Sequence, residues 1–199
     1  MNAVSQGTRD AFPPLEPPRV PTSKRTKWIV VFLAVVACGI PTSLFYWVHQ
    51  YYRIYTIISS SMEPTIRPGD YVLADMHYFQ NRLPEYGEIA LVQRNKILIV
   101  KRVAALPGDT IEGRNGVIYL NGRALSEPYI EHTAEYDRFQ NFGPITIETG
   151  QCFVMGDNRD NSFDSRHPDF GPIDLTTIAG RPLYILGSQK GNRAWERIK

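Results

Sequence analysis

Three consecutive serines, Ser59, Ser60 and Ser61, lie in a segment whose shape is set by proline. Pro64 and Pro68 follow them, and each proline fixes its own φ and lacks an amide donor, which favours a rigid loop over a helix. A serine hydroxyl on a rigid loop can act as the nucleophile of an acyl transfer when a base lies beside it. Segments rich in serine and proline are also typical of linkers, so this pattern alone leaves both interpretations open.

Two residues elsewhere in the chain could supply the base. His167 lies near Asp164 and Asp169, which suits a histidine oriented by a carboxylate, although its polar neighbours equally suit a solvated side chain. Lys101 lies in the apolar run 97–106, where burial would lower the pKa of the amine toward the range of a general base. The alternative is that Lys101 lies at a sheet edge and extends its ammonium group into water.

Segment 156–166 is dense in Asp, Asn and Ser, which bind nearby backbone groups and build ordered turns. The glycine and the closing glutamate of an EF-hand are missing, and two arginines offset the carboxylates. We therefore expect an ordered loop held by arginine–carboxylate pairs, with no metal ion. The oxygen-bearing side chains that made a calcium loop worth considering are Asn158, Asp160, Ser162 and Asp164.

The composition sets further limits. The chain has 199 residues and a formal net charge of +2, which suits one domain with an appendage and gives no argument for nucleic acid binding. Cys38 lies in an apolar segment, so we expect no disulfide with Cys152. Neither the cysteines nor the histidines form a spaced cluster, and we expect no metal and no other cofactor.

Two distinctive segments come before the serines. Residues 1–27 are polar and rich in proline, which predicts a disordered tail. Residues 28–48 run for about 20 positions without a charge, which matches one transmembrane helix with aromatic residues near both ends. A cleaved signal peptide is disfavoured, because the apolar run is long, starts late and is not followed by a small-x-small site.

Flanking charges predict the orientation of this helix. Only Arg53 lies within about fifteen residues after it, whereas five basic residues precede it. The positive-inside rule then places the N-terminus in the cytoplasm and a domain of residues 50–199 on the far side of the membrane. The preceding basic residues are Arg9, Arg19, Lys24, Arg25 and Lys27.

Residues 50–199 have the pattern of a β-rich domain. Turn signals lie at Pro107-Gly108, Asn115-Gly116 and Asn121-Gly122, and at most a short helix is expected near 175–178. We predict a mostly β fold, an antiparallel barrel or sandwich with long loops, preceded by one membrane helix. The apolar runs that predict strands are 71–74, 88–92, 97–106, 117–120, 152–155 and 182–186.

Three blocks of this sequence, in this order and behind a membrane anchor, resemble the bacterial type I signal peptidases. These are membrane serine proteases that use a Ser–Lys dyad to remove signal peptides from exported proteins. The first block is Ser59–Thr65 with Gly69-Asp70 after it, the second runs from Lys101 to Asp109, and the third runs from Gly156 to Arg166.

The resemblance implies a role for each matching residue. Ser61 would be the nucleophile and Lys101 the general base, while Ser59 and the backbone N–H of Ser61 would form the oxyanion hole. The third block would orient the lysine amine through a serine and support it through an ion pair, a set formed by Ser162, Asp164 and Arg166. Apolar residues beside the dyad would line shallow pockets for small side chains: Ile57, Ile58, Met62, Ile66, Ile99 and Val100.

The resemblance also implies partners and location. The substrates would be preproteins with small residues at positions −1 and −3, and the enzyme would lie in the bacterial inner membrane in contact with lipid. No nucleic acid and no obligate protein partner are expected. The nearest alternative is a Ser–Lys peptidase that processes pilins of conjugation systems. A self-cleaving repressor would need a DNA-binding domain in place of the anchor, and a non-catalytic tethered β-domain would need neither the serine nor the lysine.

This sequence departs from the family pattern in two places. Ser60 stands where many members have glycine, and we expect it to stiffen the loop. Met76 and His77 stand near a position that often holds lysine.

Overall fold

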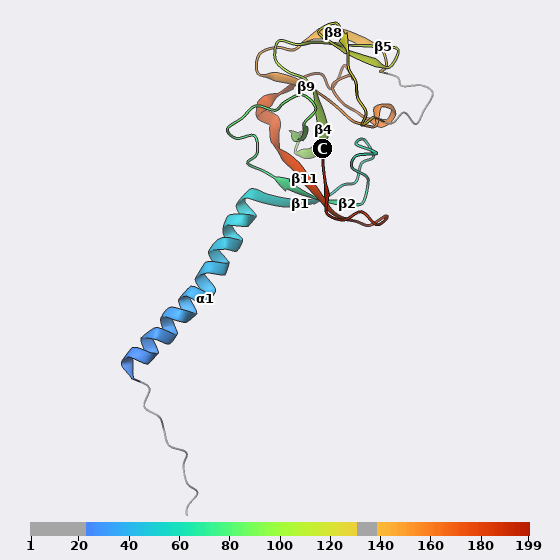
Figure 1. Ribbon diagram of the computed structural model, residues 1–199. Helices are drawn as coiled ribbons and strands as arrows, with labels where there is room; N and C mark the ends of the chain where they lie inside the picture. The colour runs from blue at the N-terminus through green and yellow to red at the C-terminus, as the bar shows by residue number, and fades with distance from the viewer. Residues whose placement is uncertain (1–22, 131–138) are drawn as a thin grey trace, which may run out of the picture. The chain divides into compact units, whose positions relative to one another are not determined.

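The computed structural model describes residues 23–130 and 139–199 (Figure 1). Within it the chain forms two compact units, one that ends at Phe45 and one that runs from Tyr46 to Lys199. Of the predicted disordered tail 1–27, residues 1–22 lie outside the described part of the chain.

Helix α1 (Lys24–Tyr51) contains the predicted transmembrane segment 28–48 and extends it at both ends. Ser23 caps the helix, because its hydroxyl accepts a hydrogen bond from the backbone N–H of Thr26 at 3.3 Å. Its 28 residues give a length of roughly 40 Å at the usual rise of an α-helix, enough for the apolar core of a bilayer.

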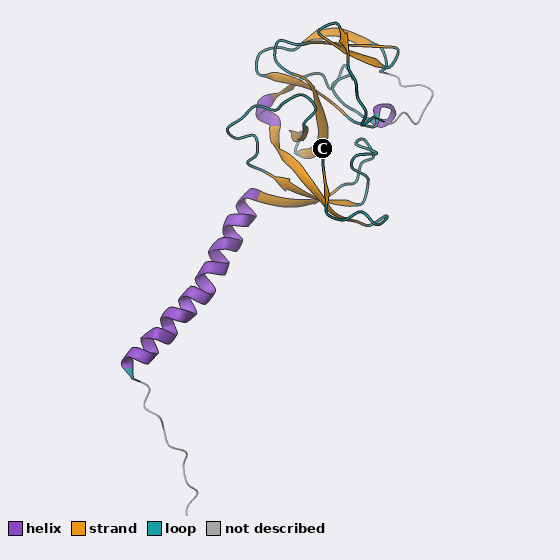
Figure 2. Cartoon of the chain, in the orientation of Figure 1, coloured by secondary structure: helices purple, strands orange, loops and turns teal. Residues whose placement is uncertain are grey.

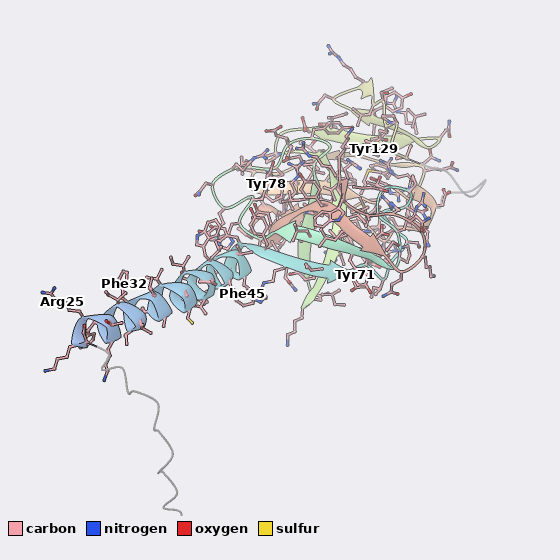
Figure 3. All side chains as sticks on the ribbon, turned by 60° about the horizontal axis from the view of Figure 1, so that its bottom comes forward. Arg25, Phe32, Phe45, Tyr71, Tyr78 and Tyr129 are labelled. Carbon is pink, nitrogen blue, oxygen red and sulfur yellow. The ribbon has the colours of Figure 1, made fainter. Side chains whose placement is uncertain are left out.

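The side chains of this helix suit an apolar surrounding. The hydroxyl of Thr42 donates to the carbonyl of Cys38 at 2.7 Å, and that of Ser43 donates to Ile40, so both are satisfied within the helix. Apolar side chains such as Phe32 are exposed along it (Figure 3). Of the helices that the structure describes, α1 alone is long and apolar enough to cross a membrane.

The larger of the two sheets carries the central strands of the domain (Figure 2). Strand β4 lies between β3 and β9, so the lysine that it carries is in the interior of the sheet, and every pairing is antiparallel. Among the described residues eight strands form this sheet. The path is β1 (Tyr52–Thr56), β2 (Asp70–Asp75), β11 (Ile178–Ser188), β3 (Ile89–Arg94), β4 (Ile97–Ala105), β9 (Gln151–Met155) and β10 (Ile173–Asp174), with β12 (Glu196–Arg197) paired to β11.

The smaller sheet is built from two tight hairpins and one strand from farther along the chain. Asn115-Gly116 joins its first hairpin and Asn121-Gly122 its second, and all four residues have positive φ, as two-residue turns require. The described strands follow the order β7 (Arg123–Ala124), β6 (Val117–Leu120), β5 (Thr110–Arg114) and β8 (Phe142–Thr146).

The prediction of a mostly antiparallel β fold behind one apolar helix is confirmed. Each of the six predicted strands overlaps an observed one. The helix expected near 175–178 is a 3₁₀ turn over Leu175–Thr177, and Gly108 has a φ of +89°, as the predicted Pro-Gly turn needs.

Three buried apolar clusters hold the domain together. One joins the two sheets, because Phe153 and Met155 of β9 pack with Ile111 and Ile118 of the smaller sheet. A second surrounds Val103 and Val154 on the other face of the larger sheet. The third anchors the serine loop through Met62 and Ile66.

Candidate active site

The serine loop is an ordered element between β1 and β2. The backbone N–H of Ile57 donates to the carbonyl of Asp70 at 2.9 Å, and Gly69 donates back to Ile57 at 2.7 Å, which closes the base of the loop. Met62 and Ile66 are buried beneath it, at 2% and 0% exposure. Apolar burial and these hydrogen bonds together hold Ser61 in place, so the linker interpretation does not apply.

Lys101 points into the domain beside Ser61. Only 4% of the lysine is exposed, and its Nζ lies 2.8 Å from Ser61 Oγ and 3.0 Å from Ser162 Oγ. The alternative of a sheet-edge lysine in water therefore fails. His167, the other candidate base, contacts Asp169 instead, with its Nδ1 accepting the Asp169 backbone N–H at 3.1 Å.

Burial changes the acidity of the lysine. Desolvation lowers the pKa of Lys101 from 10.5 to about 8; the positive charge of Arg166 acts in the same direction, and the carboxylates of Asp164 and Asp157 oppose it. The neutral amine is therefore well populated at mildly alkaline pH, which is the state that a general base requires.

The acidic partner of this lysine is itself held by an arginine. Asp164 is fully buried, accepts from Arg166 Nε at 2.9 Å and accepts the backbone N–H of Gly156 at 2.9 Å. Burial alone would raise the pKa of Asp164, but the charge and hydrogen bonds of Arg166 outweigh it, so the pKa falls below its ordinary value. Asp164 thus stays ionised, and the predicted pair with Arg166 is present in the structure.

Gly156 lies against Ser61 and Ser162. A Cβ at this position would come within 2.3 Å of both Ser162 Oγ and the backbone carbonyl oxygen of Ser61. No side chain fits there unless one of these atoms moves, so glycine permits the close packing of the first and third blocks.

Ser59 lies next to the main-chain amide of Ser61. Its Oγ accepts the backbone N–H of Ser61 at 3.2 Å. The two groups expected to form an oxyanion hole are therefore adjacent but bonded to each other. The Ser61 N–H must leave this hydrogen bond before it can donate to a substrate oxygen, whereas the Ser59 hydroxyl still has its own proton to donate.

A buried ion pair that the sequence did not predict joins the three blocks. Arg102 donates from Nε and Nη2 to the two carboxylate oxygens of Asp157 at 2.8 and 2.7 Å, and Thr65 Oγ1 donates to the same carboxylate at 2.5 Å. The next backbone N–H, of Asn158, donates to the carbonyl of Ser61 at 3.1 Å. Thr65, Arg102 and Asp157 each belong to one of the three sequence blocks, but only the fold shows that they contact one another.

We predict that Asp157→Asn destabilises the domain strongly. Removing one charge leaves Arg102 buried without its counter-ion, which typically costs about 3–5 kcal/mol. Chemical denaturation should measure this loss as a lower free energy of unfolding. Glu112→Gln is the matched control, because its pair with Arg114 lies at the surface, with Arg114 62% exposed, and should contribute at most about 1 kcal/mol. Equal losses in the two variants would contradict this role of Asp157.

Ser60 links the loop to the third block. Its Oγ accepts a hydrogen bond from Asn161 Nδ2 at 2.8 Å. A glycine could not form this contact, so the residue that departs from the family pattern adds a hydrogen bond between the two loops that carry Ser61 and Ser162.

Ser61 and Lys101 are among the residues that line a groove of about 580 Å³. The predicted pocket residues that line it are Ile57, Ile58, Met62, Ile99 and Val100. Ile66, predicted with them, is fully buried under the loop and is not among the lining residues, so it supports the groove from below. The described ranges contain no group of three His, Cys, Asp or Glu residues that could hold a metal ion.

Comparison with known proteins identifies the family. The model of the family described as signal peptidase, peptidase S26, matches residues 25–186. Signal peptidase I S of Bacillus subtilis (strain 168) is 34% identical over 139 residues, which are 66% of this chain and 75% of that protein. Thylakoidal processing peptidase 1 of Arabidopsis thaliana, a chloroplastic protein, is 31% identical over 142 residues, 65% of this chain and 40% of the relative.

A solved structure is similar in sequence over part of the chain. The crystal structure of a signal peptidase I from Enterococcus faecalis V583 is 31% identical and has a TM-score of 0.41, covering 49% of this chain and 95% of that one. The family match extends over most of the chain and includes the helix, the serine loop, the lysine strand and the third block. This protein therefore belongs to the signal peptidase family, peptidase S26.

Proposed function

We propose that this enzyme is a membrane-bound endopeptidase that removes N-terminal signal peptides from exported preproteins by means of a Ser61–Lys101 dyad. Membership of the signal peptidase family supports the reaction. The observation that supports the dyad is the buried lysine amine, 2.8 Å from Ser61 Oγ in a groove lined mostly by apolar residues.

The reaction begins with transfer of the Ser61 hydroxyl proton to the neutral amine of Lys101 as Oγ bonds to the scissile carbonyl carbon. The resulting oxyanion accepts hydrogen bonds from the Ser61 N–H and the Ser59 hydroxyl, and one such donor contributes about 3–4 kcal/mol. The protonated Lys101 then donates to the leaving nitrogen as the C–N bond breaks. This step releases the mature protein and leaves the signal peptide as an ester of Ser61.

Water completes the cycle. Lys101 takes a proton from a water molecule that attacks the ester, and the bond to Ser61 Oγ breaks as the serine regains its proton. Ser162, whose Oγ is 3.0 Å from Nζ, keeps the amine aimed at Ser61 through both steps. Asp164 and Arg166 hold the loop that carries Ser162.

The groove accounts for the proposed substrate preference. Ile57, Ile58, Ile99 and Val100 line the groove together with Ser61 and Lys101, and branched apolar walls beside the dyad would favour small side chains at positions −1 and −3. The residues before the cut would lie extended between the serine loop and β4. Lipid contact follows from the apolar helix, and no nucleic acid or obligate protein partner is required.

The charge bias around α1 supports the proposed topology, with a cytoplasmic tail of residues 1–27, a membrane helix over 28–48 and an extracytoplasmic catalytic domain over 50–199 in the inner membrane. A reporter fused after residue 60 should be active only outside the cytoplasm. Activity of that fusion inside the cytoplasm would show that the orientation is the opposite of the proposed one.

Cleavage of a preprotein tests the proposed function. The full chain in detergent or vesicles should cut a substrate with an Ala-x-Ala site after the second alanine, as read from the product masses. The same substrate with a bulky residue such as Phe at −1 should be cut far more slowly. Failure to cut the Ala-x-Ala substrate would overturn the proposal.

The pH profile should report the lowered pKa of Lys101. Below about pH 8, kcat/KM should rise about tenfold per pH unit as the amine loses its proton, and it should level off above that pH. The sign follows from the role, since the protonated amine cannot accept the serine proton. If kcat/KM instead kept rising up to a pH near 10.5, the ordinary pKa of lysine, the result would contradict a buried lysine base.

A further inference from the structure

The groove continues past the pocket residues to the hairpin between β3 and β4. Its far end is lined by Arg94, Asn95, Ile97, Phe163 and Phe170. Of the described residues that line the groove, Arg94 and Lys101 alone carry side chains that can be cationic. Since Lys101 acts as a neutral base, Arg94 is the permanent charge of the groove.

The guanidinium of Arg94 is held in place without a counter-ion. Its Nη2 donates to the carbonyl of Asp169 at 2.9 Å, and its central carbon lies 4.1 Å from the centre of the Phe170 ring. Within the described residues no carboxylate forms an ion pair with it, and the Asp169 side chain faces His167 instead, at 3.7 Å. Two backbone contacts and a ring fix the cation, and part of its hydrogen-bonding capacity remains for another group.

The register of the hairpin gives the separation along the sheet between the backbones of Arg94 and Lys101. Arg94 pairs with Ile97, which precedes Lys101 by four residues on β4. Four residues of a strand span roughly 13 Å. An extended substrate that runs alongside β4, with its −1 carbonyl at Ser61, would therefore bring about its −5 residue to Arg94.

We propose that Arg94 is a specificity-determining residue that selects an acidic side chain at about position −5 of the substrate. This inference rests on the proposed function and adds a charge preference to it. A carboxylate there would gain a charge-assisted hydrogen bond with a guanidinium that is already oriented, so little conformational entropy is lost. The apolar walls lower the screening of this interaction, and a lysine at the same position would be repelled.

Three peptides that differ at one position test this inference. Each carries the same Ala-x-Ala site, with Glu, Gln or Lys at −5, and further sets move the charge to −4 and −6. For the unmodified enzyme, the Glu peptide should exceed the Lys peptide in kcat/KM by about three- to tenfold at one or more of these positions. The ratio of kcat/KM for the Glu peptide to kcat/KM for the Lys peptide should fall toward one in Arg94→Gln. In Arg94→Glu it should fall below one. Because each ratio is taken within one enzyme, a general loss of activity cancels.

Lys96→Gln is the matched control. Lys96 lies on the same hairpin, is exposed and does not line the groove, so its removal changes the net charge equally and should leave the ratio unchanged. A ratio near one at all three positions in the unmodified enzyme, or an unchanged ratio in Arg94→Gln, overturns the inference. If the Gln peptide is cleaved while the ratio is flat, the proposed function stands and the inference alone fails. If no peptide is cleaved, the proposed function fails and the inference fails with it.

Discussion

Replacement of Lys101 with methionine should abolish preprotein cleavage while the domain remains folded. Methionine is similar in length and apolar, so it fills the space of the lysine stem but cannot take the proton of Ser61. We expect kcat/KM to fall by at least about a thousandfold. Because a buried amine is costly to desolvate, the midpoint of thermal unfolding should be unchanged or higher.

Lys96→Met is the control for this experiment. It makes the same chemical change at an exposed lysine of the preceding hairpin and should retain cleavage. Substantial activity in Lys101→Met would exclude the lysine as the base. A folded but inactive Lys101→Met beside an active Lys96→Met is the result that the mechanism requires.

Gly156→Ala should cause the second large loss, although this residue has no side chain to contribute. The new Cβ would lie 2.3 Å from Ser162 Oγ and from the carbonyl oxygen of Ser61, so at least one must move. A displacement of about 1 Å among reacting groups can cost about a hundredfold in rate. Overpacking should also lower the free energy of unfolding by about 1–3 kcal/mol.

Gly187→Ala provides the comparison. Gly187 lies on β11, and the nearest atom to a Cβ there is a Tyr71 ring carbon at 4.0 Å, an ordinary contact distance. Cleavage kinetics and denaturation of both variants should show losses in Gly156→Ala alone. If both variants keep full activity, the packing of Gly156 against Ser61 and Ser162 has no catalytic consequence.

Local signals in the sequence predicted much of the fold. The Asn-Gly pairs at 115–116 and 121–122 form tight hairpin turns because asparagine and glycine tolerate positive φ. The hairpin at Asn95-Lys96 was not predicted, since its second residue is a lysine, although both residues also have positive φ. Strand β1 (Tyr52–Thr56) was not among the predicted strands.

Which residues form the site could be predicted better than how they are arranged. Apolar neighbours indicated that Lys101 could be buried, and the resemblance supplied its partners Ser61 and Ser162, which the fold brings within 3.0 Å of it. The contact of Thr65 and Arg102 with Asp157 depends on loops far apart in the chain, and local patterns carry no information about such pairings. For the same reason nothing local distinguished Ile66, which is buried, from Met62, which also lines the groove.

Cleavage of an Ala-x-Ala preprotein by the Ser61→Ala variant is the most direct test of the dyad. The variant removes only the hydroxyl oxygen that lies 2.8 Å from Lys101 Nζ. We predict that mass spectrometry detects no cleaved product above the enzyme-free control, under conditions in which the unmodified enzyme converts the substrate completely. Cleavage by Ser61→Ala at the rate of the unmodified enzyme would contradict the assignment of Ser61 as the nucleophile.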